Sequence, residues 1–313
     1  MRDLKQPLVT IIIITFNSSK YVLDTLESAK AQTWENIELI VTDDCSVDNT
    51  LYVCAEWIEK NKNRFTRTEL ITVEKNTGIV PNLNRGLYAA KGEWIKFIAG
   101  DDMLFNNCIK RMCEEVNQYP EIEILFSNVS VNGVNKPVKY LSDFFSLESK
   151  EQYLNLLKGN FLPAPAFLIK SATLKQLNGF DEQFPFLDDY PLFIKILKAG
   201  KKLSYVNDYL VFYRDNNDSV SHSKVMNFNY VRSLKLFYKK VLLPEQKANR
   251  MYFYALHYWL EYLLLLLTER GLIKYKKDYF RLLNLLSMLI WKAKIGKKWK
   301  NLYKNSDHHF IMN

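Results

Sequence analysis

Short apolar runs alternate with amphipathic stretches along the first hundred residues. The runs have the length of strands, and the stretches between them repeat their apolar positions at helical spacing. The predicted strands are 8–15, 37–42, 69–73 and 94–99, and the predicted helices are 21–32, 49–59 and 81–90. This order predicts right-handed crossovers and an α/β fold, in which a mostly parallel sheet is flanked by helices on both faces.

Polar side chains stand at the carboxyl ends of three predicted strands. Thr15 and Asn17 follow the first strand, Asp43-Asp44 follows the second, and Gly100-Asp101-Asp102 follows the fourth. In open sheets of this kind, ligands bind beyond the carboxyl ends of the strands, because loops and helix N-termini meet there. The sequence therefore predicts the site at this edge of the sheet.

The rest of the chain turns helical. Asp188-Asp189 opens a predicted helix within 147–213, and the helical pattern is continuous from residue 225. We expect one domain over 1–224 and a helical extension over 225–313. The most apolar run of the extension, 263–267, is too short for a transmembrane span, which needs about 20 apolar residues.

Charge separates the two parts. The net charge of the 313 residues is +9, but residues 231–313 hold 17 Lys or Arg and 5 Asp or Glu, so they carry +12 and residues 1–230 carry −3. The basic residues alternate with aromatic and leucine side chains, which favours an anionic membrane surface over nucleic acid as partner. A helical subdomain with solvated lysines is the alternative. The densest cluster is Lys292, Lys294, Lys297, Lys298 and Lys300.

The four cysteines suggest a reducing compartment. Cys45, Cys54, Cys108 and Cys113 show no CxxC spacing, which argues against a zinc ribbon and a disulfide framework. The apolar run 8–14 follows Asp3 and is too short for a signal peptide. We expect a cytoplasmic protein, peripheral on the inner face of the plasma membrane.

Paired carboxylates supply the candidate chemistry. Asp101 and Asp102 repel each other in a confined turn unless a cation lies between them, and hard oxygen ligands suit Mg²⁺ or Mn²⁺ bound to a diphosphate. A turn that caps the next helix is the alternative. Asp44 could accept hydrogen bonds from a pyrimidine or a ribose, whereas capping is the favoured role of Asp48. Asp189 could be a general base, or an acid favoured by the helix dipole.

Several motifs occur in the order typical of one enzyme family, over roughly residues 7 to 222. They are Val9 to Asn17, Ala31-Gln32-Thr33-Trp34, Glu38 to Ser46, Asn76-Thr77-Gly78, Asn84-Arg85-Gly86, Gly92 to Phe97, Gly100-Asp101-Asp102, Gly179 to Glu182, Asp188-Asp189 and Tyr213-Arg214. Together they resemble the family 2 glycosyltransferases, inverting enzymes with the Rossmann-like GT-A fold that include bacterial polysaccharide and O-antigen transferases.

The resemblance implies a role for each matching position. Asp44 would contact the base, Asp102 the metal, and Asp101 the ribose or the metal's water, so both acids are candidate metal ligands. Asp189 would be the base that deprotonates the acceptor hydroxyl. Further substrate contacts are implied for Thr15, Asn17, Asn84, Asp188 and Arg214. The implied reaction moves a sugar, with inversion, from a nucleotide-sugar such as a UDP-sugar to a saccharide or lipid-linked acceptor.

Three positions depart from the family pattern. Ala99 stands where many members carry the first acid of a DxD motif, so metal binding depends on fewer ligands. Leu83 replaces an arginine, for which Arg85 is a candidate substitute. Asn216 replaces a histidine, and the nearby His222 is either a ligand of metal or phosphate or an ordinary exposed histidine.

Two other functions remain open from the sequence. A catalytically silent nucleotide-sugar-binding module would keep the same crevice but turn over no donor. A sugar nucleotidyltransferase would want a basic phosphate-binding loop near the N-terminus, which Ser18-Ser19-Lys20 matches poorly.

Overall fold

The computed structural model describes residues 6–135, 139–215 and 224–292. The described chain forms two compact units. The first unit comprises the described residues of Met1–Gln152 and Pro163–Asp215, and the second those of Tyr153–Leu162 and Asn216–Asn313.

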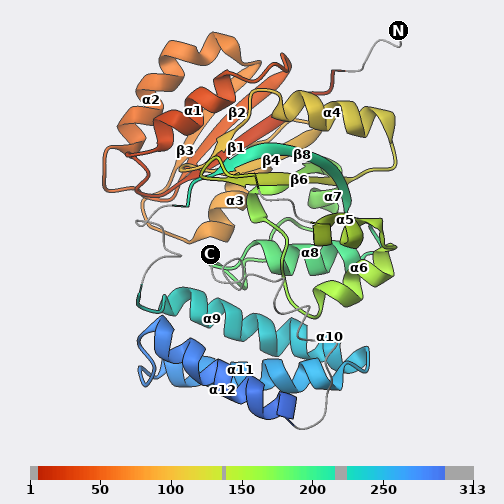
Figure 1. Ribbon diagram of the computed structural model, residues 1–313. Coiled ribbons are helices and arrows are strands. Elements are labelled where there is room, and N and C mark those ends of the chain that lie inside the picture. Colours follow the sequence, from red (N-terminus) through yellow and green to blue (C-terminus); the bar gives the residue numbers. More distant parts are fainter. Residues whose placement is uncertain (1–5, 136–138, 216–223, 293–313) are drawn as a thin grey trace. The chain divides into compact units, whose positions relative to one another are not determined.

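The first unit is built on a mixed sheet with the strand order β3-β2-β1-β4-β7-β6-β8-β5 (Figure 1). Its parallel part consists of β1 (Val9–Thr15), β2 (Ile37–Asp43), β3 (Arg67–Thr72) and β4 (Trp94–Ala99). The remaining strands are β5 (Met103–Leu104), β6 (Ile124–Val131), β7 (Phe167–Lys170) and β8 (Ser204–Tyr213). β7 pairs antiparallel with both β4 and β6, and β8 pairs parallel with β6.

Helices cover both faces of this sheet. On one face lie α1 (Val22–Lys30), α2 (Thr50–Asn61) and α4 (Cys108–Gln118), and on the other lie α3 (Ile79–Ala89) and α8 (Asp189–Lys198) (Figure 1). Since successive residues of a strand point to opposite faces, Ile11 and Ile13 pack among residues of α1, α2 and α4, whereas Ile12 meets Gly86 of α3. The shorter helices are α5 (Lys139–Ser146), α6 (Ser149–Leu156) and α7 (Ser171–Gln176).

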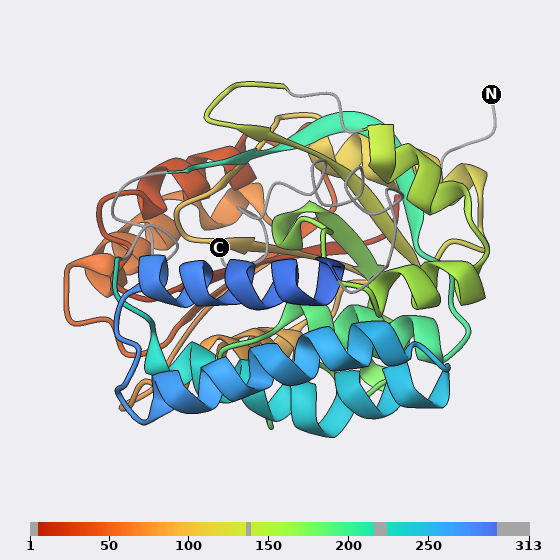
Figure 2. The same cartoon turned by 60° about the horizontal axis from the view of Figure 1, so that its bottom comes forward.

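The second unit is helical. Its elements are α9 (Phe228–Phe237), a π-helical turn η4 (Tyr238–Leu242), α10 (Leu243–Ala248), α11 (Tyr252–Glu269) and α12 (Lys276–Lys292). Helices α9 and α12 both contact α11 (Figure 2). The segment 153–162 belongs to this unit because the Tyr153 hydroxyl donates to Glu245 at 2.6 Å and the Tyr258 hydroxyl donates to the Lys158 carbonyl at 3.0 Å.

Among the described residues, no helix combines the length and the apolar content that a transmembrane span requires. The lysine cluster 292–300, predicted to dock on a membrane, lies outside the residues whose side chains are described.

The α/β architecture predicted from the sequence is confirmed. Each of the seven elements predicted over residues 8–99 is present, with its ends within two residues of the prediction. The domain boundary at 224 remains a prediction.

Candidate functional site at the carboxyl ends of β1, β2 and β4

Three strand ends that carry polar residues are neighbours in the sheet. Thr15 at the end of β1 is in register with Asp43 at the end of β2, and Ile14 is in register with Ala99 at the end of β4. The Asp44 N–H donates to the Thr15 carbonyl at 3.0 Å, and the Gly100 N–H donates to the Ile14 carbonyl at 2.9 Å. The structure therefore brings Thr15, Asp44 and the Asp101-Asp102 turn to one edge.

The loop after β1 is fixed to the loop after β2 by hydrogen bonds. The Thr15 hydroxyl donates to Asp43 Oδ1 at 2.8 Å, and Thr15 is buried. Asn17 has a left-handed backbone with φ 51°; its N–H donates to Ser46 Oγ at 2.8 Å, and its Oδ1 accepts from the Val47 N–H at 2.9 Å. Asn17 itself is exposed, so it can meet a ligand over a preformed loop.

Asp44 is buried, and four donor groups reach its carboxylate. Oδ1 accepts from the Thr77 hydroxyl at 2.7 Å, and Oδ2 from the Gly78 N–H at 2.7 Å. The Thr77 N–H lies 3.0 Å and 3.1 Å from the two oxygens, and Arg85 Nη2 donates to Oδ1 at 2.7 Å. Asp44 thereby ties the β2 turn to the loop before α3.

Arg85 is the ion-pair partner of Asp44. Besides Asp44 it reaches the Thr77 hydroxyl at 2.8 Å and Asn82 Oδ1 at 3.0 Å. Its Nε is buried and has no partner among the described residues. Arg85 therefore supplies a positive charge near the strand ends even though Leu83 stands at the family's arginine position.

Asp48 is confirmed as a capping residue. Its Oδ1 accepts from the Thr50 N–H at 3.0 Å, in the first turn of α2, and its Oδ2 accepts from the Ser19 N–H at 3.1 Å. Although burial opposes ionisation, these hydrogen bonds lower the pKa of Asp48 to about 2.

The Asp101-Asp102 turn fits tightly against the β1 loop. A Cβ at Gly100 would lie 2.9 Å from Thr15 Cγ2 and 3.1 Å from Ser18 Oγ, so glycine is needed for this close approach. Asp102 is 3% exposed, and its carbonyl accepts from the Thr25 hydroxyl at 2.7 Å. The backbone of the turn is therefore fixed to α1.

Arg214 clamps this turn from the end of β8. Its backbone N–H donates to Asp102 Oδ1 at 2.9 Å, and its Nε donates to the Asp101 carbonyl at 2.9 Å. The guanidinium also pairs with Asp24 at 2.9 Å and lies over the Tyr21 ring, 4.7 Å from the centroid. A residue 112 positions along the chain from Asp102 thus joins the predicted site.

The electrostatics of the two adjacent acids suit a divalent cation. Burial raises the pKa of both carboxyls, and the negative charge of Asp101 raises the pKa of Asp102 further. The positive charges of Arg214 and Lys96 lower the pKa of Asp102, but they offset this rise only in part. A bound cation would remove the repulsion, and carboxylate oxygens are ligands that Mg²⁺ and Mn²⁺ prefer. Among the described residues, no group of three or more His, Cys, Asp or Glu is arranged to hold a metal ion.

Asp188 and Asp189 lie at the N-terminus of α8, as predicted. Asp189 Oδ1 accepts from the Tyr190 N–H at 2.6 Å, and burial raises the pKa of Asp188. The loop before α8 packs against the loop before α3, because the Val80 N–H donates to the Pro185 carbonyl at 3.1 Å. A Cβ at Gly78 would lie 2.7 Å from that carbonyl. The loop that holds Asp44 therefore also contacts the loop that leads to Asp189.

Two buried polar residues have structural partners. Asn84 donates to the Phe180 carbonyl at 3.0 Å and to Glu182 at 2.9 Å, and its Oδ1 accepts from the Phe180 N–H at 3.0 Å, so its contact with substrate stays a prediction.

Sequence reasoning missed Lys96, whose ammonium donates to the Pro165 and Phe167 carbonyls and whose pKa burial lowers to about 8. A lysine within an apolar strand was the available signal. His222 lies outside the described residues.

The fold and these acidic strand ends define a glycosyltransferase of the GT-A class. The chain belongs to glycosyl transferase family 2, whose model matches residues 10–176. An uncharacterized glycosyltransferase of Haemophilus influenzae is 26% identical over 277 residues, which cover 88% of this chain and 100% of that protein. WfaP of Escherichia coli, a UDP-Glc:alpha-D-GlcNAc-diphosphoundecaprenol beta-1,3-glucosyltransferase, is 30% identical over 219 residues, covering 69% of this chain and 81% of WfaP.

Solved structures share the fold. TarS 1-349 of S. aureus in complex with UDP-GlcNAc aligns with a TM-score of 0.59 and 22% identity, over 75% of this chain and 66% of TarS. The mannosyltransferase PcManGT of Pyrobaculum calidifontis, in complex with GDP-Man and Mn²⁺, aligns with a TM-score of 0.62 and 17% identity, over 98% of this chain and 86% of that protein.

Proposed function

We propose that this glycosyltransferase is inverting and metal-dependent, and that it moves a sugar from a UDP-sugar to an acceptor hydroxyl. The observation that carries the proposal is the Asp101-Asp102 pair at the end of β4, next to the polar end of β1; Asp102 is buried and Asp101 is half-buried. The ligands named for TarS, UDP-GlcNAc, and in the name of WfaP, UDP-Glc, favour UDP over GDP as the nucleotide.

Asp102 and Asp101 would hold Mn²⁺ or Mg²⁺ against the diphosphate. When bound there, the cation supplies Lewis-acid stabilisation of the leaving diphosphate. Asp44, Thr15 and Asn17 would bind the nucleoside, since they lie on the neighbouring strand ends. Arg214 keeps the Asp101-Asp102 turn in place and adds positive charge beside it.

Asp189 would be the general base. Its place at the N-terminus of α8 favours the ionised carboxylate, because the helix dipole stabilises a negative charge there. The carboxylate would accept the proton of the acceptor hydroxyl as that oxygen attacks the anomeric carbon from the face opposite the diphosphate. The carbon–oxygen bond to the diphosphate breaks in the same step, so the configuration inverts.

The acceptor we propose is lipid-linked or a growing surface polysaccharide, of the O-antigen type. The name of WfaP describes an acceptor carried on diphosphoundecaprenol, and the helical extension of this chain is basic and aromatic. We propose that the enzyme acts in the cytoplasm, peripheral on the inner face of the plasma membrane.

Mass spectrometry of the intact protein with a nucleotide-sugar panel and Mn²⁺ or Mg²⁺ tests the donor first. The selected donor is then used with Asp189→Asn, which should abolish transfer while nucleotide binding persists. Asp208→Asn, at an exposed carboxylate that pairs with Arg111, is the matched control and should keep transfer. A wild-type protein that binds a donor but never turns it over would indicate a silent binding module. Release of pyrophosphate when the protein is given a nucleoside triphosphate and a sugar 1-phosphate would indicate a nucleotidyltransferase.

A further inference from the structure

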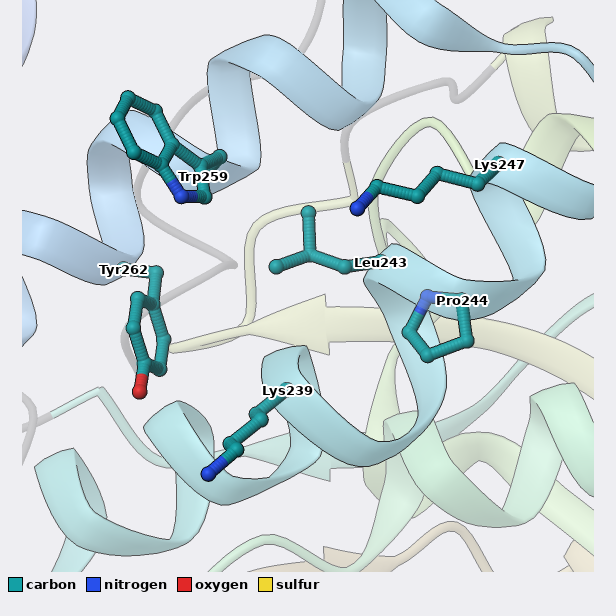
Figure 3. Close-up of a pocket in the computed structure, with 6 residues that line it drawn as sticks. All are labelled: Lys239, Leu243, Pro244, Lys247, Trp259 and Tyr262. Atoms are coloured by element: carbon teal, nitrogen blue, oxygen red, sulfur yellow. The ribbon is translucent and has the colours of Figure 1, made fainter.

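A cavity of about 390 Å³ lies within the helical unit, apart from the acidic strand ends. Its lining residues come from the π-helical turn, α10 and α11, and they are Lys239, Leu243, Pro244, Lys247, Trp259 and Tyr262. Figure 3 shows the rings of Trp259 and Tyr262 on one side, Pro244 and Lys247 on the other, and Leu243 between them. The wall is therefore largely apolar with two ammonium groups.

The two lysines carry uncompensated charge. In the part of the chain that the structure describes, the ammonium groups of Lys239 and Lys247 form no ion pair or hydrogen bond, although those of other lysines in the unit do, such as Lys235 with Glu269. Among the described residues that line the cavity, none is acidic. Lys239 lies on a π-helical turn, a distortion that occurs frequently at functional sites. The cavity is thus suited to an anion.

An exposed apolar row on α11 adjoins the cavity. Tyr252, Leu256 and Trp259 are 66%, 47% and 46% exposed, and their spacing of four and three residues places them on one face of the helix. Tryptophan and tyrosine beside lysine are typical of surfaces that lie at the headgroup level of a membrane, where rings meet acyl chains and ammonium groups meet phosphates. An inorganic anion would leave this row uncovered.

We propose that this cavity binds the phosphate headgroup of an anionic bilayer phospholipid, with Lys239 and Lys247 on the phosphate and Trp259 inserted beside the first acyl carbons. The inference gives the proposed membrane partner a defined site within the described residues. The segment 293–313 is an unsuitable occupant, because it holds five lysines and one aspartate and would be repelled by the two ammonium groups.

Vesicle co-sedimentation without any donor tests the site. With phosphatidylglycerol in phosphatidylcholine vesicles, Lys239→Gln/Lys247→Gln should bind roughly 30-fold more weakly than wild type, since each basic residue contributes about 1 kcal/mol near an anionic surface. The matched control is Lys110→Gln/Lys150→Gln, which removes the same charge from exposed lysines of the other unit and should stay within about threefold of wild type. Equal weakening by both pairs would overturn the proposal.

Trp259 gives an independent readout. Bromine on the acyl chains should quench part of the tryptophan fluorescence of the full chain. In Trp259→Phe, which keeps an apolar ring, this quenching should be smaller by the share that comes from Trp259. Identical quenching in wild type and Trp259→Phe would contradict insertion at this site. Saturable binding of inorganic phosphate that depends on Lys239 and Lys247, together with unchanged vesicle binding, would assign the cavity to a free anion instead.

Failure of this inference and failure of the proposed function are distinguishable. Vesicle binding is measured without donor, and turnover is measured separately on wild type. A protein that transfers sugar but binds vesicles independently of Lys239 and Lys247 contradicts only the lipid site. A protein that loses vesicle binding in the double variant, yet never turns over a donor, contradicts only the enzymatic proposal.

Discussion

Two acidic turns, at the ends of the strands on either side of β1, differ in how their carboxylates are satisfied. At the end of β2, the carboxylate of Asp44 receives four donor groups, including the charged Arg85. At the end of β4, within the described part of the chain, one hydrogen bond reaches the carboxylate of Asp102, and burial beside Asp101 raises its pKa. The same dipeptide of aspartates therefore has two different environments.

The fold itself satisfies the carboxylate of Asp44, whereas the carboxylate of Asp102 is the one for which we propose a bound cation. Four protein donors around Asp44 satisfy its carboxylate and fix the loop before α3. Asp102 has one such donor, the Arg214 N–H, and we propose that a bound cation neutralises its charge. A buried acid held at a cost to stability is expected where the charge serves function.

The largest effect should come from Asp102→Asn. The amide keeps the shape of the side chain but removes the charge that would hold a cation, so transfer should fall by about 10³-fold, as when a principal electrostatic contact is removed. Steady-state kinetics over a Mn²⁺ titration measures this. Because the repulsion from Asp101 is also removed, the free energy of unfolding without metal should not decrease. A clear loss of stability together with full activity would show that Asp102, and not only Asp44, is held for its contribution to the fold.

Asp44→Asn should have the opposite signature. It leaves Arg85 without its carboxylate and turns an acceptor toward a donor at Thr77 or Gly78, so the free energy of unfolding of the first unit should fall by about 3 kcal/mol. Urea unfolding with near-UV circular dichroism measures it. Stability equal to wild type would show that the four donors are not what holds this loop.

A substitution of Arg85 should also destabilise the first unit, but by less than Asp44→Asn. Arg85→Met removes the charged donor but keeps those of Thr77 and Gly78, so unfolding of the first unit should become easier by about 2 kcal/mol. Arg85→Lys is the control, since it keeps the charge but loses the planar fork, and it should recover part of the loss. Equal effects of the two substitutions would show that the charge of Arg85 does not contribute to the stability of the first unit.

Glu261 offers a buried acid for comparison in the helical unit. It accepts from the Tyr279 hydroxyl at 3.1 Å, and burial raises its pKa from 4.5 to about 7. A raised pKa in the folded state means that stability is fully present below pH 4.5 and declines as the pH rises through about 7. Glu261→Gln should remove this decline and stabilise the unit by about 1 kcal/mol at pH 8. The free energy of unfolding of both proteins, measured from pH 4 to pH 8, tests this. The same pH dependence in wild type and Glu261→Gln would contradict the prediction.

The sequence predicted what depends on local periodicity. Apolar spacing predicted the strands and helices over residues 8–99. Because the carboxyl ends of parallel strands lie at the same edge of a sheet, it also predicted where Thr15, Asp44 and Asp102 lie. The antiparallel β7 between β4 and β6 was not predictable in this way, because its partners lie far away in the chain.

The sequence could not distinguish the roles of the two aspartate pairs. Asp44 is satisfied by Thr77 and Arg85, 33 and 41 residues away, and Asp102 is reached by the backbone of Arg214, 112 residues away. Such partners are set by tertiary packing, which apolar spacing does not reveal. For the same reason the segment 153–162 was not expected to belong with the C-terminal helices.

Crystals soaked with UDP and MnCl₂ test the central claim most directly, through anomalous difference density at the manganese absorption edge. We expect one peak at the Asp102 carboxylate, next to the diphosphate of UDP, and none at Asp44. A peak at Asp43-Asp44 or at Asp188-Asp189, with none at Asp101-Asp102, would contradict it.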